Sequence, residues 1–262
     1  LWSSSDGGNT WSTNTDGLPV IGVSYIAINP LNSQEMYITT GDAHASDTYS
    51  IGILKSNDGG QTWDTTGMQF GITDDKMVNK VIIHPTYTDS LFAVTDKNIK
   101  ISADGGQTWS NALTSSGSTM IGRFRDIEFK PNNPNILYAV KQTTGSSEVY
   151  KSTDRGLSWS SAMNGISLVN RNRPLLAVTP ANPDVVYVLF CKNDYGFHGI
   201  YKSTDNADSW TLQSDSPNIL GRDTDGTSTG GQSWYDLSLG VSTEDEDLLY
   251  VGGINLWRST DG

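Results

Sequence analysis

Short apolar runs alternate with polar turns along the whole chain, in an order that repeats. Alternating apolar residues that run into a turn indicate a first strand, and a β-branched or aromatic run after the turn indicates a second. A third run then leads into a Ser and an Asp that recur in each repeat. The expected first strands are 22–30, 81–85, 127–131, 176–180 and 239–242, the second 35–40, 90–95, 136–141, 184–191 and 248–252, and the third 52–55, 98–101, 148–151, 199–202 and 255–258.

An eight-residue turn of the form Ser-x-Asp-x-Gly-x-Thr-Trp follows each third strand, and we call it the repeat turn. Its copies start at Ser4, Ser56, Ser102, Ser152, Ser203 and, truncated, Ser259. The spacing of about 50 residues is the length of one four-stranded propeller blade. The sequence therefore predicts an all-β chain, a β-propeller of four-stranded antiparallel blades, with four complete and two partial blades.

The residue types of the repeat turn have a physical reason. A carboxylate at the third position can accept hydrogen bonds from N–H groups of a tight loop, and glycine permits the positive φ that the loop needs. The Ser and Thr hydroxyls complete the hydrogen bonding, and the Trp anchors the next strand. We expect a structural role for the six aspartates Asp6, Asp58, Asp104, Asp154, Asp205 and Asp261.

The repeat turn resembles the Asp-box, also called the bacterial neuraminidase repeat, over essentially the whole chain. Asp-box propellers include sialidases, sortilin-like receptors and xyloglucan-degrading hydrolases. The resemblance implies that 1–262 is a single propeller fragment, with blade boundaries near 18, 71, 118, 166 and 221, and that the turns lie on the outer part of each blade. Because the first and last strands are both third strands, we expect the fragment to belong to a larger ring that the rest of a longer chain completes.

Composition restricts the partners. The net charge is −12, from 17 basic and 29 acidic residues, which argues against nucleic acid and anionic membranes. The longest apolar run, 185–191, is too short to cross a bilayer, so no membrane insertion is expected. Cys191 is the only cysteine and is expected to be buried. A neutral glycan or an extracellular protein remains a possible partner.

Candidate catalytic residues are carboxylates on loops that face the mouth of a propeller. Asp42 and Asp47 flank His44 between a second and a third strand, which is a group able to do acid–base chemistry. Asp126 and Asp236 lie at the entries of two inner strands. The alternative for each is an ordinary turn or salt-bridge residue.

Candidate binding residues are arginines and aromatics at the same entries. Arg125 and Arg173 are suited to a carboxylate-bearing sugar, although the Arg-Ile-Pro signature that accompanies sialidase Asp-boxes is missing. Salt bridges between blades are the alternative. Tyr195, Trp234 and Tyr235 are able to stack on sugars, or else to pack between blades.

No cofactor is expected, with calcium as the one possibility. The long loop 220–234 contains Asp223 and Asp225, whose alternating oxygens resemble part of a calcium loop. The later bidentate Glu of an EF-hand and its flanking helices are both missing. The three histidines lack the spacing of a zinc site.

The stretches 230–237 and 250–262 look like large secreted propeller proteins of Bacteroidetes, which are cargo of the type IX secretion machinery. That resemblance implies a secreted or cell-surface protein. Because no complete catalytic set is visible, the sequence favours a non-catalytic scaffold or binding module for glycan or protein. The alternative is a glycoside hydrolase that acts on a polysaccharide with two carboxylates at the mouth.

Overall fold

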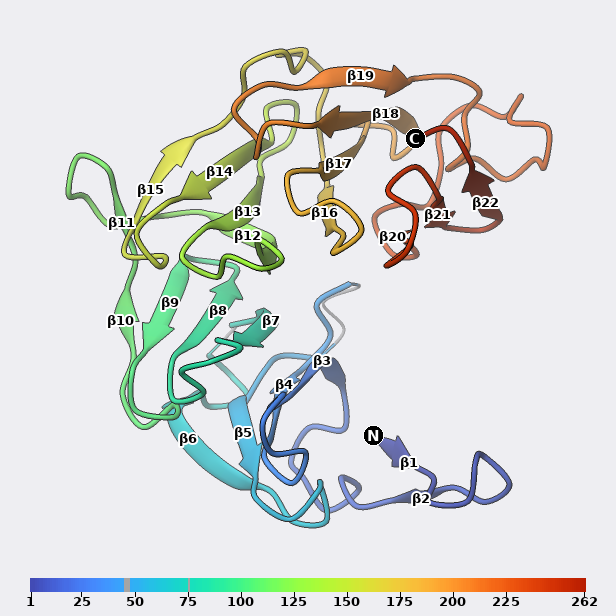
Figure 1. Cartoon of the computed structure of the whole chain (residues 1–262). Helices are drawn as coiled ribbons and strands as arrows, with labels where there is room; N and C mark the ends of the chain where they lie inside the picture. Colours follow the sequence, from blue (N-terminus) through green and yellow to red (C-terminus); the bar gives the residue numbers. More distant parts are fainter. Residues whose placement is uncertain (45–47, 75) are drawn as a thin grey trace. The chain divides into compact units, whose positions relative to one another are not determined.

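The computed structural model describes residues 1–44, 48–74 and 76–262, and all of its regular elements there are β-strands (Figure 1). The chain divides into two compact units, Leu1–Asn111 and Ala112–Gly262. Each unit is described by itself below. Within the described residues, no helix is present that is long and apolar enough to cross a bilayer.

Unit 1 contains one two-stranded sheet and two four-stranded sheets, which we call blades. All neighbouring strands in these sheets pair antiparallel. The strands are β1 (Trp2–Ser3) and β2 (Ser12–Thr13), then β3 (Val23–Ile28), β4 (Met36–Thr40), β5 (Gly52–Ser56) and β6 (Asp64–Gln69), then β7 (Val78–Ile83), β8 (Leu91–Thr95), β9 (Ile99–Ser102) and β10 (Ser110–Asn111).

Unit 2 contains two complete blades and one three-stranded sheet. The strands of the complete blades are β12 (Arg123–Phe129), β13 (Leu137–Gln142), β14 (Glu148–Ser152) and β15 (Ser158–Ser161), then β16 (Pro174–Val178), β17 (Val186–Cys191), β18 (Phe197–Ser203) and β19 (Thr211–Ser214). The three-stranded sheet consists of β20 (Ser238–Val241), β21 (Leu249–Gly252) and β22 (Leu256–Ser259).

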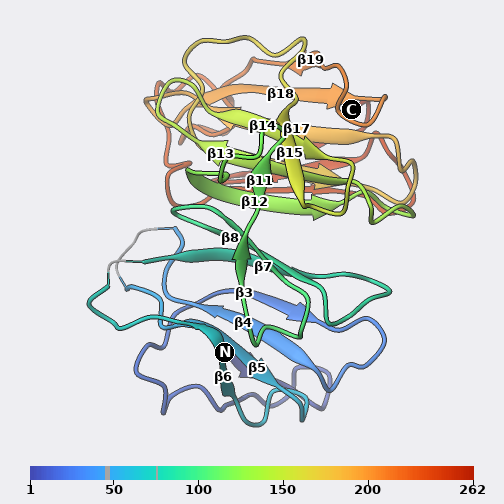
Figure 2. The same cartoon turned by 90° about the vertical axis from the view of Figure 1, so that its left-hand side faces the viewer.

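The predicted blade pattern is confirmed, with four complete and two partial blades in the expected strand order. The sequence missed β11 (Leu113–Thr114), which pairs parallel with β15 at the outer edge of its blade (Figure 2). Two residues are too few to give an alternation signal, and their pairing partner lies more than 40 residues away. Parallel pairing of this kind is therefore invisible to a local pattern.

The core of each unit lies between neighbouring sheets. The first strands of neighbouring blades adjoin, β3 with β7 in unit 1 and β12 with β16, then β16 with β20, in unit 2. In unit 2, Tyr138, Val188 and Phe190 are fully buried in one cluster that also contains Trp210. The side chain of Trp210 donates from Nε1 to the carbonyl of Ala162 at 2.9 Å. Buried tryptophans therefore join one blade to the next.

The repeat turn has the same hydrogen bonds in each of its five complete copies. In the copy that starts at Ser152, the Ser152 hydroxyl donates to Asp154 Oδ1 at 2.8 Å and accepts from the buried Gly156 N–H at 2.9 Å. Asp154 also accepts from the N–H and hydroxyl of Ser158, at 2.9 and 2.6 Å. The carboxylate closes the turn from inside, as the sequence predicts.

These bonds stabilise the charged carboxylates. The hydroxyl and then the N–H of the seventh turn residue hold the pKa of four aspartates at about 2: Asp6, Asp58, Asp104 and Asp205. At Asp154 partial burial would raise the pKa, but the hydrogen bonds from Ser158 and Ser152 outweigh it and the pKa is lowered. The turn aspartates are therefore ionised structural groups.

In the fifth copy Ala207 stands where the other complete copies have glycine, and the turn keeps its hydrogen bonds. Ala207 donates to Ser203 Oγ at 2.8 Å and adopts a φ of 65°. The preceding Asn206 has a φ of 64°. Two residues with side chains therefore adopt the left-handed region, which costs free energy that the hydrogen bonds of the turn offset.

Candidate functional site

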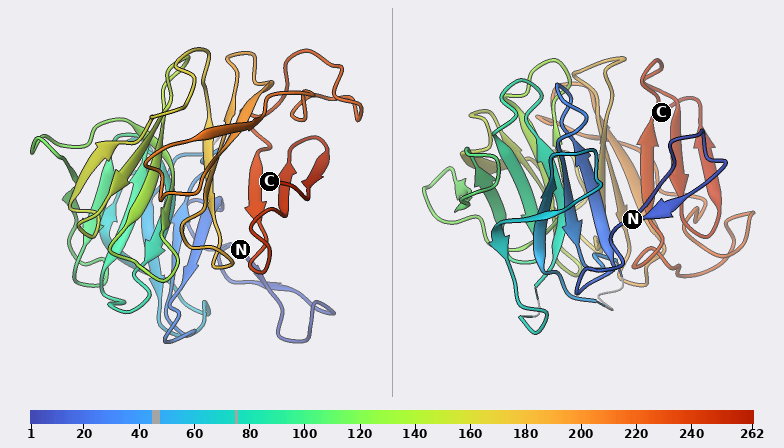
Figure 3. Two further views of the ribbon diagram at one scale, coloured as in Figure 1. Left: turned by 45° about the horizontal axis from the view of Figure 1, so that its top comes forward. Right: turned by 90° about the horizontal axis from the view of Figure 1, so that it is seen from below.

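The loops at one end of the blades in unit 2 are joined into a continuous surface that we call the loop face. It consists of the second-to-third-strand loops and the loops that enter first strands: residues 143–147, 165–173, 192–196, 215–237 and 253–255. Asn193 donates its N–H to Asn170 Oδ1 at 3.1 Å, and the Asn255 side chain donates to the carbonyl of Arg222 at 3.0 Å. The long loop after β19 is visible in orange in Figure 3. Hydrogen bonds thus tie each loop to the next.

Residues 231–236 are held at three points on the loop face. The Gly231 N–H donates to the carbonyl of Asp194 at 3.2 Å, and the Ser233 hydroxyl donates to the carbonyl of Tyr195 at 2.6 Å. An Nη1 group of Arg173 donates to the carbonyl of Trp234. A Cβ on Gly231 would lie 2.4 Å from two carbonyl oxygens, so only glycine permits this close approach. We call residues 231–236 the clamped segment.

The clamped segment presents two adjacent aromatic rings to solvent. Trp234 is 45% exposed and Tyr235 is 50% exposed, and their ring centroids are 5.6 Å apart at 49°. The following Asp236 has a buried Oδ1 with no hydrogen-bond partner in the part of the chain that the structure describes. Asp236 thus places a carboxylate directly after the two exposed rings in the chain.

The two arginines at the entry of β16 are buried and bind loop carbonyls. Arg171 donates from Nε to the carbonyl of Ser147 at 2.8 Å, and also to the carbonyl of Ser167. Arg173 is 3% exposed and binds the clamped segment. Beside it, burial raises the pKa of the Cys191 thiol to about 11, so the thiol stays neutral. The expected burial of Cys191 is confirmed.

Arg125 and Asp126 lie in β12, where the pairing with β13 shifts register between Phe124 and Asp126. A bulge of this kind changes the directions of the side chains around it. Arg125 donates from Nε to Gln142 Oε1 at 2.5 Å. Asp126 is 6% exposed, and its Oδ2 accepts the N–H of Leu176 in the next blade at 3.0 Å. The structure therefore gives both residues hydrogen bonds inside or between blades.

The other predicted carboxylates are Asp42 and Asp47. Asp42, in unit 1, accepts the N–H of His44 at 2.8 Å, which is the bonding of a turn residue. Asp47 lies outside the described residues. The ring of Tyr195 packs partly buried against the core, and its carbonyl rather than its ring contacts the clamped segment. Catalytic roles for these carboxylates stay predictions.

The proposed calcium loop forms its own hydrogen bonds. Asp225 Oδ1 accepts from both the N–H and the hydroxyl of Thr227, at 3.0 and 2.8 Å, and these bonds lower the pKa of Asp225. The carbonyl of Asp223 accepts the Gly226 N–H at 3.1 Å. In residues 1–44, 48–74 and 76–262 no three His, Cys, Asp or Glu side chains gather in a way that could hold a metal ion. Calcium at Asp223 and Asp225 stays a prediction.

His198 supports the loop face from β18. Its Nε2 contacts the carbonyl of Val169 at 3.0 Å, while Nδ1 is buried without a hydrogen-bond partner among the described residues. The ring stacks on Tyr201 at a centroid distance of 6.2 Å. Burial, with the nearby charges of Arg171 and Lys192, lowers the pKa of His198. The neutral imidazole is therefore favoured.

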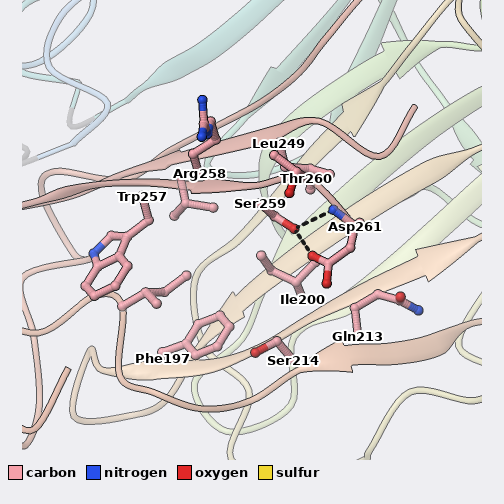
Figure 4. Close-up of a pocket in the computed structure, with 13 residues that line it drawn as sticks. Phe197, Ile200, Gln213, Ser214, Leu249, Trp257, Arg258, Ser259, Thr260 and Asp261 are labelled. Carbon is pink, nitrogen blue, oxygen red and sulfur yellow. Dashed lines mark hydrogen bonds between the residues drawn. The ribbon is translucent and has the colours of Figure 1, made fainter. Parts of the chain in front are cut away.

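A cavity of about 470 Å³ in unit 2 is lined by none of the predicted catalytic or binding residues (Figure 4). Its lining combines apolar side chains such as Phe197 and Trp257 with the repeat turn at Ser259–Gly262. It lies along β22, whose outer edge is unpaired in the three-stranded sheet. In the complete blades a fourth strand pairs with the corresponding edge. This cavity therefore lies where a fourth strand packs in the other blades.

The sequence singled out Arg173 and Tyr195, but it did not identify Ser233 and Asp194, which also hold the clamped segment. Ser233 and the loop with Asp194 carry no motif, and their contacts join positions 37 or more residues apart. The one available signal was the turn Asn193-Asp194-Tyr195-Gly196, which is typical of a loop between a second and a third strand. Asp194 adds a carboxylate to the loop face that the sequence did not single out.

Comparisons with known proteins match this architecture. A family model described as Sortilin, neurotensin receptor 3, matches residues 97–219. A xyloglucanase from Paenibacillus sp is 25% identical over 179 residues, which is 58% of this chain and 17% of the relative. This chain therefore spans about a sixth of that relative.

Solved structures of larger enzymes align with nearly the whole chain. The GH74 xyloglucanase from Xanthomonas campestris has a TM-score of 0.66 and 16% identity, and covers 97% of this chain and 40% of its own. The GH74 enzyme from Niastella koreensis has a TM-score of 0.63 and 19% identity, and covers 92% of this chain and 37% of its own. The fold is that of a β-propeller. Identities this low establish the fold alone, and the activity is addressed below.

Proposed function

We propose that this chain is part of a polysaccharide-binding propeller of the glycoside hydrolase kind, in which Trp234 and Tyr235 stack on sugar rings. This proposal rests on the exposed pair of rings, which the clamped segment holds in place. The carboxylate of Asp236, which has an oxygen without a hydrogen-bond partner among the described residues, follows the rings in the chain. Flat apolar sugar faces pack on aromatic rings, and rigid rings lose little entropy on binding.

The similarity to a xyloglucanase supports a hydrolase over the non-catalytic module, which was favoured because no complete catalytic set is visible in the sequence. Hydrolysis of a glycosidic bond needs a general acid and a second carboxylate as nucleophile or base. In this proposal Asp236 is one of the two, and Asp194, on the loop that binds the Gly231 N–H, is the candidate for the other. A polysaccharide substrate also implies a secreted or cell-surface protein.

Binding is tested with the protein in affinity electrophoresis against xyloglucan, cellulose-type β-glucan and an anionic polysaccharide. We expect retardation by a neutral β-glucan, and about thirtyfold weaker binding by Trp234→Ala, since an aromatic anchor contributes about 2 kcal/mol. Trp2→Ala is the matched control, because Trp2 is 64% exposed in unit 1. Equal binding by Trp234→Ala and the wild type would remove the aromatic pair from the proposal.

Hydrolysis is tested separately, by release of reducing ends from whichever polysaccharide binds. We expect Asp236→Asn to lower kcat at least a hundredfold while retaining binding, because a carboxylate that donates or accepts a proton in the transition state contributes about 10²–10⁴-fold. Binding without any product from the wild type would restore the non-catalytic module as the better reading.

A further inference from the structure

Arg173, at the entry of β16, was a candidate for binding an acidic sugar, but its surroundings indicate a different role. Arg173 is 3% exposed, so its guanidinium has no open surface to offer a ligand. An Nη1 group of this guanidinium donates to the carbonyl of Trp234, at the centre of the clamped segment. We infer that Arg173 is a positioning residue, which fixes the Trp234 ring through the backbone of the clamped segment and does not touch the glycan itself.

The backbone of Arg173 is fixed, so its side chain reaches the clamped segment from a rigid base. The carbonyl of Arg173 accepts the Cys191 N–H at 3.2 Å, and the Asn172 N–H donates to the carbonyl of Cys191 at 2.7 Å. These two bonds hold the entry of β16 to the end of β17. A planar, always-charged guanidinium on such a base loses little freedom when it binds a carbonyl.

The clamped segment comes from the loop before β20, whereas Arg173 and Tyr195 belong to the blade β16–β19. Without the arginine, the segment keeps its internal bonds from the Tyr235 and Asp236 N–H groups to the carbonyl of Gln232, but its remaining described bonds to the neighbouring blade are those of Gly231 and Ser233, both on the N-terminal side of Trp234. The rings of Trp234 and Tyr235 would then be free to rotate with their backbone. Supporting interactions of this kind keep a binding group within the fraction of an ångström that function requires.

Arg171 provides a matched control for this inference. It has the same charge and the same 3% exposure, and it also donates to loop carbonyls, those of Ser147 and Ser167. These bonds hold the backbone at residues 147 and 167, outside the clamped segment. Loss of either arginine removes a buried charge and its hydrogen bonds, but only the loss of Arg173 should release Trp234.

The test uses protein labelled with 5-fluorotryptophan, whose Trp234 resonance is assigned by its disappearance in Trp234→Phe. In Arg173→Ala we expect the Trp234 resonance to shift and broaden, while in Arg171→Ala it stays at the wild-type position. Arg173→Lys, which keeps one charged donor, should recover part of the wild-type line. A wild-type Trp234 resonance in folded Arg173→Ala would overturn the inference.

If Arg173→Ala does not fold, Arg173→Lys and Ser233→Ala decide the question. Ser233→Ala releases the same segment at its other hydrogen-bonded side chain, so both variants should broaden the Trp234 line relative to Arg171→Lys. Sharp wild-type lines in both would contradict a role in positioning.

The consequence for the glycan rests on the proposed function and is measured separately. We expect Arg173→Ala to bind the polysaccharide that retards the wild type about tenfold more weakly. In a variant that already has Trp234→Ala, the Arg173→Ala change should cause no further loss of affinity. Additive losses in the double variant would mean that Arg173 acts independently of Trp234. Failure of the wild type to bind any glycan would contradict the proposed function, whereas the fluorine spectrum would still decide the role of Arg173.

Discussion

The repeat turns and the clamped segment are both held by hydrogen bonds to side chains, but they differ in where the partners come from. In a repeat turn the Ser, Asp and Thr partners lie within eight residues of one another. In the clamped segment the partners lie 37 to 61 residues away. Local bonding repeats with the sequence, whereas long-range bonding occurs once. The local bonds stabilise the turns of the blades, and the long-range bonds hold the candidate site.

Replacement of one tryptophan from each region should give the largest contrast in stability. Trp159 follows a repeat turn and is 1% exposed, so Trp159→Ala should lower the free energy of unfolding by about 3–5 kcal/mol. Trp234→Ala should change it by less than about 0.5 kcal/mol, because its ring is on the surface. Urea unfolding followed by circular dichroism measures both. Comparable losses would mean that the clamped segment is part of the core.

Ser152→Ala tests the hydrogen bonding of a repeat turn without removing a large side chain. The change leaves the buried N–H of Gly156 without its acceptor, so we expect a loss of about 1–3 kcal/mol in the free energy of unfolding. Ser160→Ala, at an exposed position of β15, is the control and should be neutral. If the two variants were equally stable, the hydroxyl at the start of the turn would be dispensable.

Arg155 tests the backbone conformation of a repeat turn. It has a φ of 60° and an exposed side chain at a position where three other complete copies and the truncated copy have glycine. Arg155→Gly should be more stable than Arg155→Ala by about 1 kcal/mol, because only glycine adopts this conformation without strain. Thermal unfolding of the two variants gives the comparison. A more stable alanine variant would show that entropy of the unfolded chain outweighs the strain.

Acidification should separate His198, which supports the loop face, from the repeat turns by pH, with smaller effects than the substitutions. Because burial lowers the pKa of His198 in the folded protein, the unfolded chain binds this proton first, and stability falls as the pH drops below about 6.5 toward the lower folded pKa. The repeat-turn aspartates have folded pKa values of about 2 against 3.8, so their contribution is lost only as the pH falls through that lower window.

Urea midpoints between pH 7 and pH 3 measure this difference, with His198→Gln as the comparison. The variant should lack the decline near neutral pH and share the decline below about pH 4. Identical profiles for the wild type and His198→Gln would show that protonation of His198 is not linked to unfolding.

The same contrast explains what the sequence could predict. Strand order, blade number and the bonding of the repeat turn follow from patterns within about 50 residues, and the structure confirms them. Trp234, Tyr235 and Asp236 were found because they lie at a first-strand entry. The role of Arg173 was not predictable, because its partner is a backbone carbonyl 61 residues away. Every residue has such a carbonyl, so no residue type in the sequence indicates which one is the acceptor. The burial of Asp126 against Leu176 depends in the same way on how blades meet.

The clamped segment also bears on how such a site is inherited. The segment and the residues that hold it belong to consecutive blades. Arg173 and Tyr195 lie on one blade, and Trp234 lies on the loop into the next. Duplication of a single blade in the gene would copy one half without its counterpart, and insertion of a blade between the two would separate them. Only the pair of blades, copied together, is a heritable module that transfers the site intact.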